Sequence, residues 1–347
     1  MQNRILRIMI MLAWLPAVAL GFMLCLWGLV ERKSELITPI LEWLPFLTPA
    51  MLSDPIAYRK VVWTLSFDYF LLTELRFSMI LVLIVGPGLI SQDLRFNALP
   101  LYFSRPVRRI DYFLGKLGVV AYFLGMVLIV PSIIAYVLGL VFSLDLSIVK
   151  DTFPVLLAAL GYGVVMTLSI GLLILALSAL SRNSRFVALF WVGVWFVSFV
   201  AAQVLAGING EMRQQAHNRH AAEMNHAARQ PAKTPEEQRA QQIAMQDAVR
   251  KLEEEIEAEE KRQAKKDWRP MISFATNLTR VGTHMLGTDA SWERLAEDLP
   301  KEARYRFLQE WLGPRYPWYW SAIVLLVLFG LSVCILNFRV KSLDRLR

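Results

Sequence analysis

The side chains best suited to metal chemistry are the histidines, and three of the four recur at three-residue steps with an acid among them: His217, His220, Glu223 and His226. Successive residues of an α-helix are about 100° apart, so on a helix His226 points about half a turn away from His217. His217 and His220 share a face, but two ligands do not complete a zinc site. The spacing favours a solvated polar helix, and we predict no metal site.

The familiar catalytic and phosphate-binding patterns are missing from the sequence. No Gly-x-x-x-x-Gly-Lys-Ser/Thr loop occurs, because Gly115 and Lys116 are followed by leucine. There is no Gly-x-Ser-x-Gly elbow. Cys25 and Cys334 lie in apolar runs, where a small buried hydrophobe is the expected role. We predict no catalytic residue and no cofactor in this chain, which is therefore not expected to be an enzyme or to hydrolyse ATP.

The composition indicates a membrane protein. The chain has 347 residues, of which 56% are hydrophobic and 19% charged, and a mean hydropathy of +0.43. These values are far more apolar than those of an average soluble protein. Several apolar runs are long enough to cross a hydrocarbon core of about 30 Å as helices. We predict six spans, at residues 8–30, 71–90, 114–142, 155–180, 186–208 and 317–338.

Charged residues precede the first of these spans and occur within the second. The first follows Arg4 and Arg7 and is long for a cleaved signal peptide, so we expect an uncleaved anchor. The second contains Glu74 and Arg76, which we expect to lie near a membrane surface or to face protein.

The positive charges predict the orientation, because short loops rich in Lys and Arg stay in the cytoplasm. With the N-terminus inside, the inner segments are 1–7, 91–116, 181–185 and 339–347. They hold 13 of the 37 Lys and Arg residues but only three of the 29 acidic residues. The net charge of +8 comes from these segments, so we predict attraction to membrane lipid and no nucleic-acid partner.

A polar segment at residues 209–316 separates the fifth span from the sixth and holds 18 basic and 18 acidic residues. Thr234, Pro235 and Glu237 form an N-terminal capping pattern that predicts a helix at 235–266. Its apolar stripe lasts about two heptads, which leaves open a lone solvated helix and a short coiled coil. The predicted fold class is thus an all-α integral membrane protein with six transmembrane helices. Both termini are cytoplasmic, and a large, mostly helical extracytoplasmic insertion joins helices five and six.

The longest inner loop, residues 91–116, combines basic and aromatic side chains in the sequence LYFSRPVRRIDYFLGK at 101–116. Arginines that snorkel to the membrane surface would explain the positive charge, but not the aromatic residues or their order. The apolar residues from Leu94 to Phe103 also predict a short helix with one apolar face, which Pro106 ends. Such a helix, rimmed with arginine at the membrane surface, suits a groove in a second protein. Pro87, between two glycines, predicts a weak point at the inner end of the second span.

The run GPGLISQDLRFNALPLYFSRPVRRIDYFLGKL resembles the signature between the second and third spans of ABC-2-type transporter permeases, also called type V exporters. Two further runs resemble the family at the corresponding positions of the chain: LSALSRNSRFVALFWVGVW and the C-terminal NFRVKSLDRLR. The chain departs from the family where a Glu-rich turn and a Gly-Thr pair are common, because it has Ser91, Gln92 and Asp93, then Asn97 and Ala98. The residues that fit the signature are Ser104, Arg105, Pro106, Arg108, Arg109, Tyr112, Leu114, Gly115 and Lys116.

The resemblance implies a division of labour. A separate cytoplasmic ATPase subunit would bind ATP and Mg, and residues 91–116 would be the coupling loop that it contacts. A second permease chain, identical or related, would complete the translocation path. The domains are then 1–208 with spans one to five and the coupling loop, 209–316 as the insertion, and 317–347 with span six and the cytoplasmic tail. The candidate ATPase interface comprises Asp93, Leu94, Arg95, Phe96, Leu99, Leu101, Tyr102, Phe103, Ser104, Arg105, Pro106, Arg108, Arg109, Asp111 and Lys116.

The function expected from these features is export across a bacterial inner membrane, with a hydrophobic or amphipathic cargo because the spans carry few charges. The alternative is an ATPase-coupled mechanical or scaffolding protein whose insertion grips an extracytoplasmic partner without moving a substrate.

Overall fold

The structure is a computed structural model that describes residues 2–32, 49–98, 108–143, 147–208, 266–300 and 316–343, together with single positions and pairs at 102, 262, 303–304, 307–308 and 311–312. All regular elements in these residues are helices. The predicted helix and coiled coil at 235–266 fall outside the described residues, apart from Arg262 and Lys266. The histidines at 217–226 also lie outside them.

The prediction of six spans is confirmed, because the described residues contain six helices long and apolar enough to cross a membrane. The first span consists of α1 and α2, the second of α5 and α6, and the fifth of α10, the π-helical turn η2 and its continuation to residue 208. The bounds are α1 Gln2–Ala13, α2 Leu15–Glu31, α5 Pro55–Val85, α6 Gly88–Arg95, α8 Arg109–Ser143, α9 Ser147–Leu180, α10 Ser184–Val192, η2 Gly193–Val197 and α16 Trp318–Leu343.

The second span begins earlier than residue 71. Helix α5 starts at Pro55 after the short helix α4 (Pro49–Ser53), and the Asp54 carboxylate caps it by accepting a hydrogen bond from the Ala57 amide at 3.3 Å. The sequence analysis missed this part of the helix because its charged residues are typical of loops, and their burial is known only from the structure. Glu74 is fully buried against protein, as expected, whereas Arg76 is exposed.

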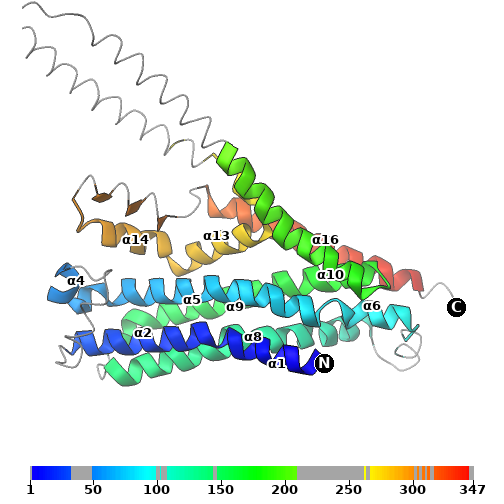
Figure 1. Cartoon of the computed structure of the whole chain (residues 1–347), viewed down its shortest axis with the longest axis horizontal. Coiled ribbons are helices and arrows are strands. Elements are labelled where there is room, and N and C mark those ends of the chain that lie inside the picture. Colours follow the sequence, from blue (N-terminus) through cyan, green and yellow to red (C-terminus); the bar gives the residue numbers. More distant parts are fainter. Residues whose placement is uncertain are drawn as a thin grey trace, which may run out of the picture.

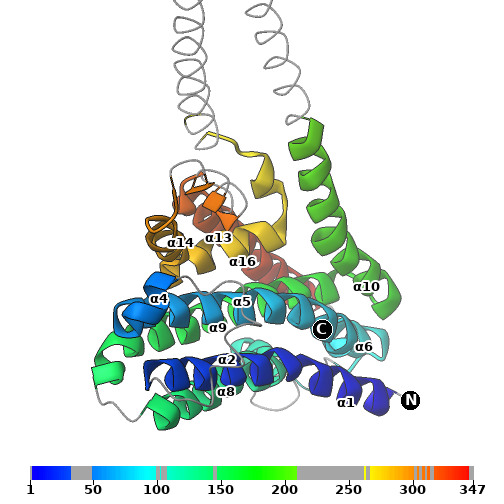
Figure 2. The same ribbon diagram turned by 60° about the vertical axis from the view of Figure 1, so that its left-hand side comes forward.

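Helices α2, α5, α8 and α9 lie side by side as a bundle, with α1 along its lower edge in Figure 1 and the same neighbours in Figure 2. Its core is apolar and includes Leu24, Phe67, Leu124 and Ile170, all buried. Small residues set the helix spacing: a Cβ on Gly139 of α8 would lie 2.6 Å from the Trp63 ring of α5. The fifth span diverges from the bundle in both views.

The part of the insertion that the structure describes next to the sixth span is helical. A 3-10 turn η3 (Arg269–Ile272) leads into α13 (Phe274–Leu286), which Ser273 caps and Gly287 ends at φ +74°. Helix α14 (Thr288–Ala296) follows. Helix α13 packs against α9 and α16, and the His284 ring stacks on Trp318 with centroids 4.2 Å apart.

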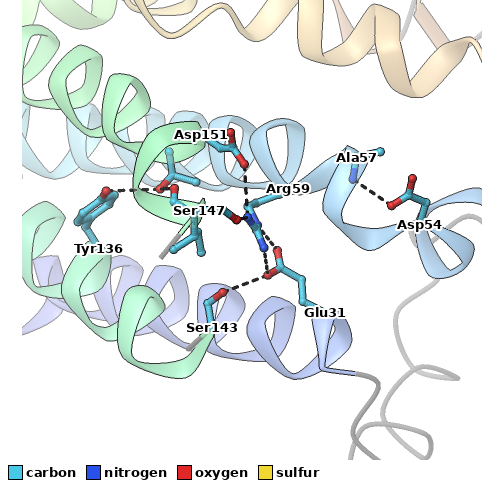
Figure 3. A network of polar contacts seen from close by, with 10 residues as sticks. Glu31, Asp54, Ala57, Arg59, Tyr136, Ser143, Ser147 and Asp151 are labelled. Carbon is cyan, nitrogen blue, oxygen red and sulfur yellow. Dashed lines mark hydrogen bonds and ion pairs between the residues drawn. The ribbon is translucent and has the colours of Figure 1, made fainter. Parts of the chain in front are cut away.

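A buried ion-pair network joins α2, α5, α8 and α9 at the end of the bundle opposite α6 (Figure 3). The Arg59 guanidinium donates to both carboxylate oxygens of Glu31, at 2.8 and 2.9 Å, and to Ser147 Oγ at 3.0 Å. It also donates to Asp151 Oδ2 at 3.3 Å, and Ser143 Oγ donates to Glu31 at 3.1 Å. The Arg59 and Glu31 side chains are 2% and 5% exposed. The free-energy cost of burying each charge is therefore offset mainly by the attraction of the other.

Replacing one partner of this pair should destabilise the protein strongly. Arg59→Met leaves the Glu31 carboxylate buried without its cation, and a buried charge that loses its partner costs about 3–5 kcal/mol. We expect a lower thermal unfolding midpoint of the purified protein in detergent, with Lys60→Met, the exposed neighbour, as the control. The double variant Arg59→Met, Glu31→Leu should recover most of the loss. A double variant no more stable than the single one would contradict this role.

Candidate functional site

The two helices that flank the predicted inner loop, α6 and the start of α8, meet at one end of the bundle. Helix α6 continues the second span at that end, and the start of α1 and the end of α16 point the same way (Figure 1). The loop is bounded by the end of α6 at Arg95 and the start of α8 at Arg109. The described residues of the loop therefore include its two flanking helices and Tyr102.

A serine from the fourth span holds the start of α6. Helix α5 ends at Val85, and the first amides of the new helix have no partner within it. Ser178 Oγ of α9 accepts hydrogen bonds from the Ile90 and Ser91 amides, both at 3.0 Å, and donates to the Pro87 carbonyl at 2.9 Å. Ser178 is fully buried, so this contact replaces water at the break.

Close packing at the break brings α5 and α9 together. A Cβ on Gly86 would lie 2.3 Å from Ile174 Cγ1, so a larger residue does not fit without movement of α9. The weak point predicted around Pro87 is thus the place where the helix is interrupted. The sixth span joins the same corner, because Arg339 donates to the Leu180 carbonyl at 2.7 Å and caps the end of α9.

An acidic residue of α6 and two residues of α8 clamp the two sides of the loop together. Lys116 Nζ lies 2.6 Å from Asp93 Oδ2, and the Tyr112 hydroxyl donates to the same oxygen at 2.7 Å. Lys116 also lies over the Tyr112 ring, 5.4 Å from its centroid, and the Tyr102 ring is 5.7 Å from that of Tyr112. We call Asp93, Tyr112 and Lys116 the loop clamp. Its members are charged or hydrogen-bonded and partly shielded, which makes such contacts stronger than surface ion pairs.

The predicted short helix from Leu94 to Phe103 is wrong at residues 96–98, which are not helical, and residues 99–101 and 103 of that prediction lie outside the described residues. Helix α6 starts at Gly88 and ends at Arg95, and Asn97 adopts φ +51°. The Ala98 amide donates to the Asp93 carbonyl at 2.9 Å, which closes the helix end in the way a left-handed cap residue does. Asparagine tolerates this conformation better than most residues, and this signal at Asn97 was missed.

The remaining predicted interface residues are only partly placed. Arg95 and Phe96 are exposed at the end of α6, Leu94 is half-buried, and Arg109 begins α8. The Arg108 amide donates to Asp111 Oδ2 at 3.1 Å at the start of α8. The rest of the predicted interface lies outside the described residues: Leu99, Leu101, Phe103, Ser104, Arg105 and Pro106.

A comparison of the sequence with protein families identifies the family of the chain. A model of the family described as "ABC-2 family transporter protein" matches residues 72–287, which is more than half of the chain and contains α6, the loop clamp and α9. The chain belongs to the ABC-2 transporter family. No curated protein and no solved structure is detectably similar to it.

Membership confirms the resemblance carried by residues 86–117 and identifies the chain as an ABC transporter permease, a multi-pass membrane protein. In ABC-2 transporters this subunit is typically non-catalytic and associates with an ABC ATPase. Ser178, which holds the start of α6 in this permease, was not singled out from the sequence, and Asn97 was noted only as a departure from the family pattern.

Loss of the loop clamp should loosen α6 and the start of α8. Asp93→Asn removes the ion pair with Lys116 and weakens the bond from Tyr112; hydrogen bonds to charged groups contribute about 1.5–3 kcal/mol. We expect amide hydrogen exchange over residues 88–98 and 109–116 to rise about tenfold or more, measured by mass spectrometry on the purified permease. Asp111→Asn is the matched control for residues 88–98, because Asp111 is an exposed acid of the same loop whose hydrogen bond is to the Arg108 amide and not to α6. Equal exchange in the two variants would argue against the clamp.

Proposed function

We propose that this permease is the membrane-spanning subunit of an ATP-driven exporter in a bacterial inner membrane. A separate cytoplasmic ATPase docks on the coupling loop, residues 91–116, and supplies the energy. ATP and Mg bind to that subunit, since the chain has no phosphate-binding loop of the Gly-x-x-x-x-Gly-Lys-Ser/Thr kind. The observation that carries the proposal is the attachment of α6 to the third span through Asp93 and to the fourth span through Ser178.

The attachment gives the loop mechanical leverage. Asp93 holds α6 to α8 through Lys116 and Tyr112, and Ser178 holds α6 to α9. A push on the loop therefore reaches the second, third and fourth spans together. The break around Pro87 lets α6 tilt relative to α5, because the helical hydrogen-bond ladder is interrupted there.

The orientation of the proposal puts the coupling loop in the cytoplasm. It rests on the 13 basic and three acidic residues of the four inner segments, which follow the positive-inside rule. The arrangement in Figure 1 supports it, since the start of α1, α6 and the end of α16 lie toward one end of the molecule. The insertion at 209–316 is then extracytoplasmic.

A second permease chain fits the faces that the fold leaves open. In their most apolar stretches the fifth and sixth spans have only 17% and 22% of residues buried, against 61% for the fourth. On α5 the exposed face carries Tyr69 and Arg76, and a charged side chain within a span normally faces protein or a water-filled path rather than lipid. We propose that two chains, identical or related, line the translocation path, and that the cargo is hydrophobic or amphipathic.

The ATPase partner is tested by co-purification. The tagged permease, extracted in mild detergent, should retain an ATPase whose amount and activity fall at least tenfold when Arg105, Arg108 and Arg109 are all replaced by Glu. The control variant replaces Arg4, Arg7 and Arg182 by Glu; these are basic residues of the other predicted inner segments. This variant should retain the ATPase. No associated ATPase in the unaltered protein, or equal loss in both variants, would contradict the proposal.

The orientation is tested by labelling in intact cells. In a background with Cys25 and Cys334 replaced by Ala, Ser104→Cys should react with a membrane-impermeant maleimide only after lysis. Lys60→Cys, exposed at the opposite end of α5, should react in intact cells. Labelling of position 104 from outside would place the loop on the wrong side and remove the site of the ATPase.

A further inference from the structure

A cavity of about 520 Å³ lies beside the loop clamp, where the first, second, third and fifth spans meet. Its walls are formed by the start of α1, the end of α5 with α6, the start of α8 and the start of α10. The volume is in the range of pockets that hold small molecules. Neither the proposed coupling by the loop nor the family membership assigns a ligand to it.

The walls change from polar to apolar in the same direction on three elements. On α8 the lining passes from Lys116 to Phe123, two turns further along the helix. On α10 it passes from Arg185 to Ala188, and from α6 back into α5 it passes from Gln92 to residues 83–85. In each case the polar residue lies toward the end of the bundle that carries the coupling loop, and the apolar one lies deeper. The cavity therefore suits a molecule with a polar head and an apolar body, aligned with the spans.

The charge of the polar part favours an anion. Asp93 and Lys116 line the cavity and neutralise one another through their 2.6 Å contact. Arg185 adds one positive charge, and no ion-pair partner for its guanidinium is found among the residues that the structure describes. A planar guanidinium binds phosphate oxygens in a forked geometry that ammonium groups lack. Ser184, next to it, adds a hydroxyl donor to the same wall.

We propose that this cavity binds the phosphate headgroup of one anionic phospholipid, with Arg185 as the main contact and Lys116 as the second. The glycerol and the first part of the acyl chains extend along Leu83, Phe123 and Ala188. A free phosphate ion would leave that apolar wall unused, whereas a phospholipid at the membrane surface presents head and chains in the required order. Basic pockets between spans on the cytoplasmic side are typical sites for anionic headgroups.

The site lies next to the contact that holds the coupling loop. Because Lys116 belongs both to the loop clamp and to the cavity wall, a bound phosphate shares this ammonium group with Asp93. Lipid occupancy and the stiffness of α6 are then linked, and each must affect the other to the same extent in free energy.

The test measures lipid binding to the purified, delipidated full-length permease by native mass spectrometry, and needs no ATPase. Phosphatidylglycerol should bind more tightly than phosphatidylcholine, and Arg185→Gln should weaken the phosphatidylglycerol affinity about fivefold while leaving phosphatidylcholine unchanged. Arg182→Gln is the matched control, an exposed arginine three residues earlier that does not line the cavity. The affinity of the Arg182→Gln variant for phosphatidylglycerol should stay within twofold of that of the unaltered protein.

Two further arms separate a lipid site from an anion site. Ala188→Trp fills the apolar wall and should weaken phosphatidylglycerol binding as much as Arg185→Gln does. An excess of inorganic phosphate over the lipid should not displace the lipid. Displacement by phosphate, equal affinity for the two lipids, or an Arg185→Gln variant that binds normally would each overturn the proposal. Arg185 and Ala188 line the cavity and do not belong to the predicted ATPase interface, so failure here is distinguishable from failure of the proposed transport function.

Discussion

The arrangement of this permease at the end of the bundle that carries α6 depends on a break in one helix and on the Ser178 hydroxyl, which binds the backbone at that break. Where α5 stops at Val85, the first backbone amides of α6 have no partner within that helix, and buried amides require one. Ser178 of α9 supplies two acceptor contacts and one donor contact at this point. The direction of α6 is therefore set by the fourth span, and the positions of Asp93, of the loop and of the cavity follow from it.

The two ends of the bundle use charge in different ways. Far from the loop, Arg59 and Glu31 are almost fully buried and tie four helices into one unit through several hydrogen bonds. At the other end, Asp93 and Lys116 are partly exposed and connect α6 and α8, the two helices that flank the loop. The first arrangement favours rigidity, since separating its charges leaves them in a medium that solvates them poorly. The second is more accessible to water, because the Lys116 and Asp93 side chains are 20% and 15% exposed.

Sequence patterns located the spans well and local geometry less well. Six apolar runs predicted six helices, because hydrophobicity summed over twenty residues outweighs any single substitution. The start of the second span was misplaced by 16 residues, at Leu71 instead of Pro55, since Arg59, Asp68 and Glu74 resemble loop residues until their burial is known. The helix predicted at 94–103 failed at Asn97, where one left-handed residue ends α6. Apolar spacing carries no information on that dihedral angle.

The sequence by itself determined the membrane class, the number of candidate spans and the family, because each of these depends on composition or on residues close together in the chain. Only the tertiary structure decided which side chains meet between the spans. Ser178 reaches amides 87 and 88 residues away, and the cavity combines side chains from four spans. Such contacts depend on how the helices pack against one another, and neither hydropathy nor charge along the chain specifies that packing.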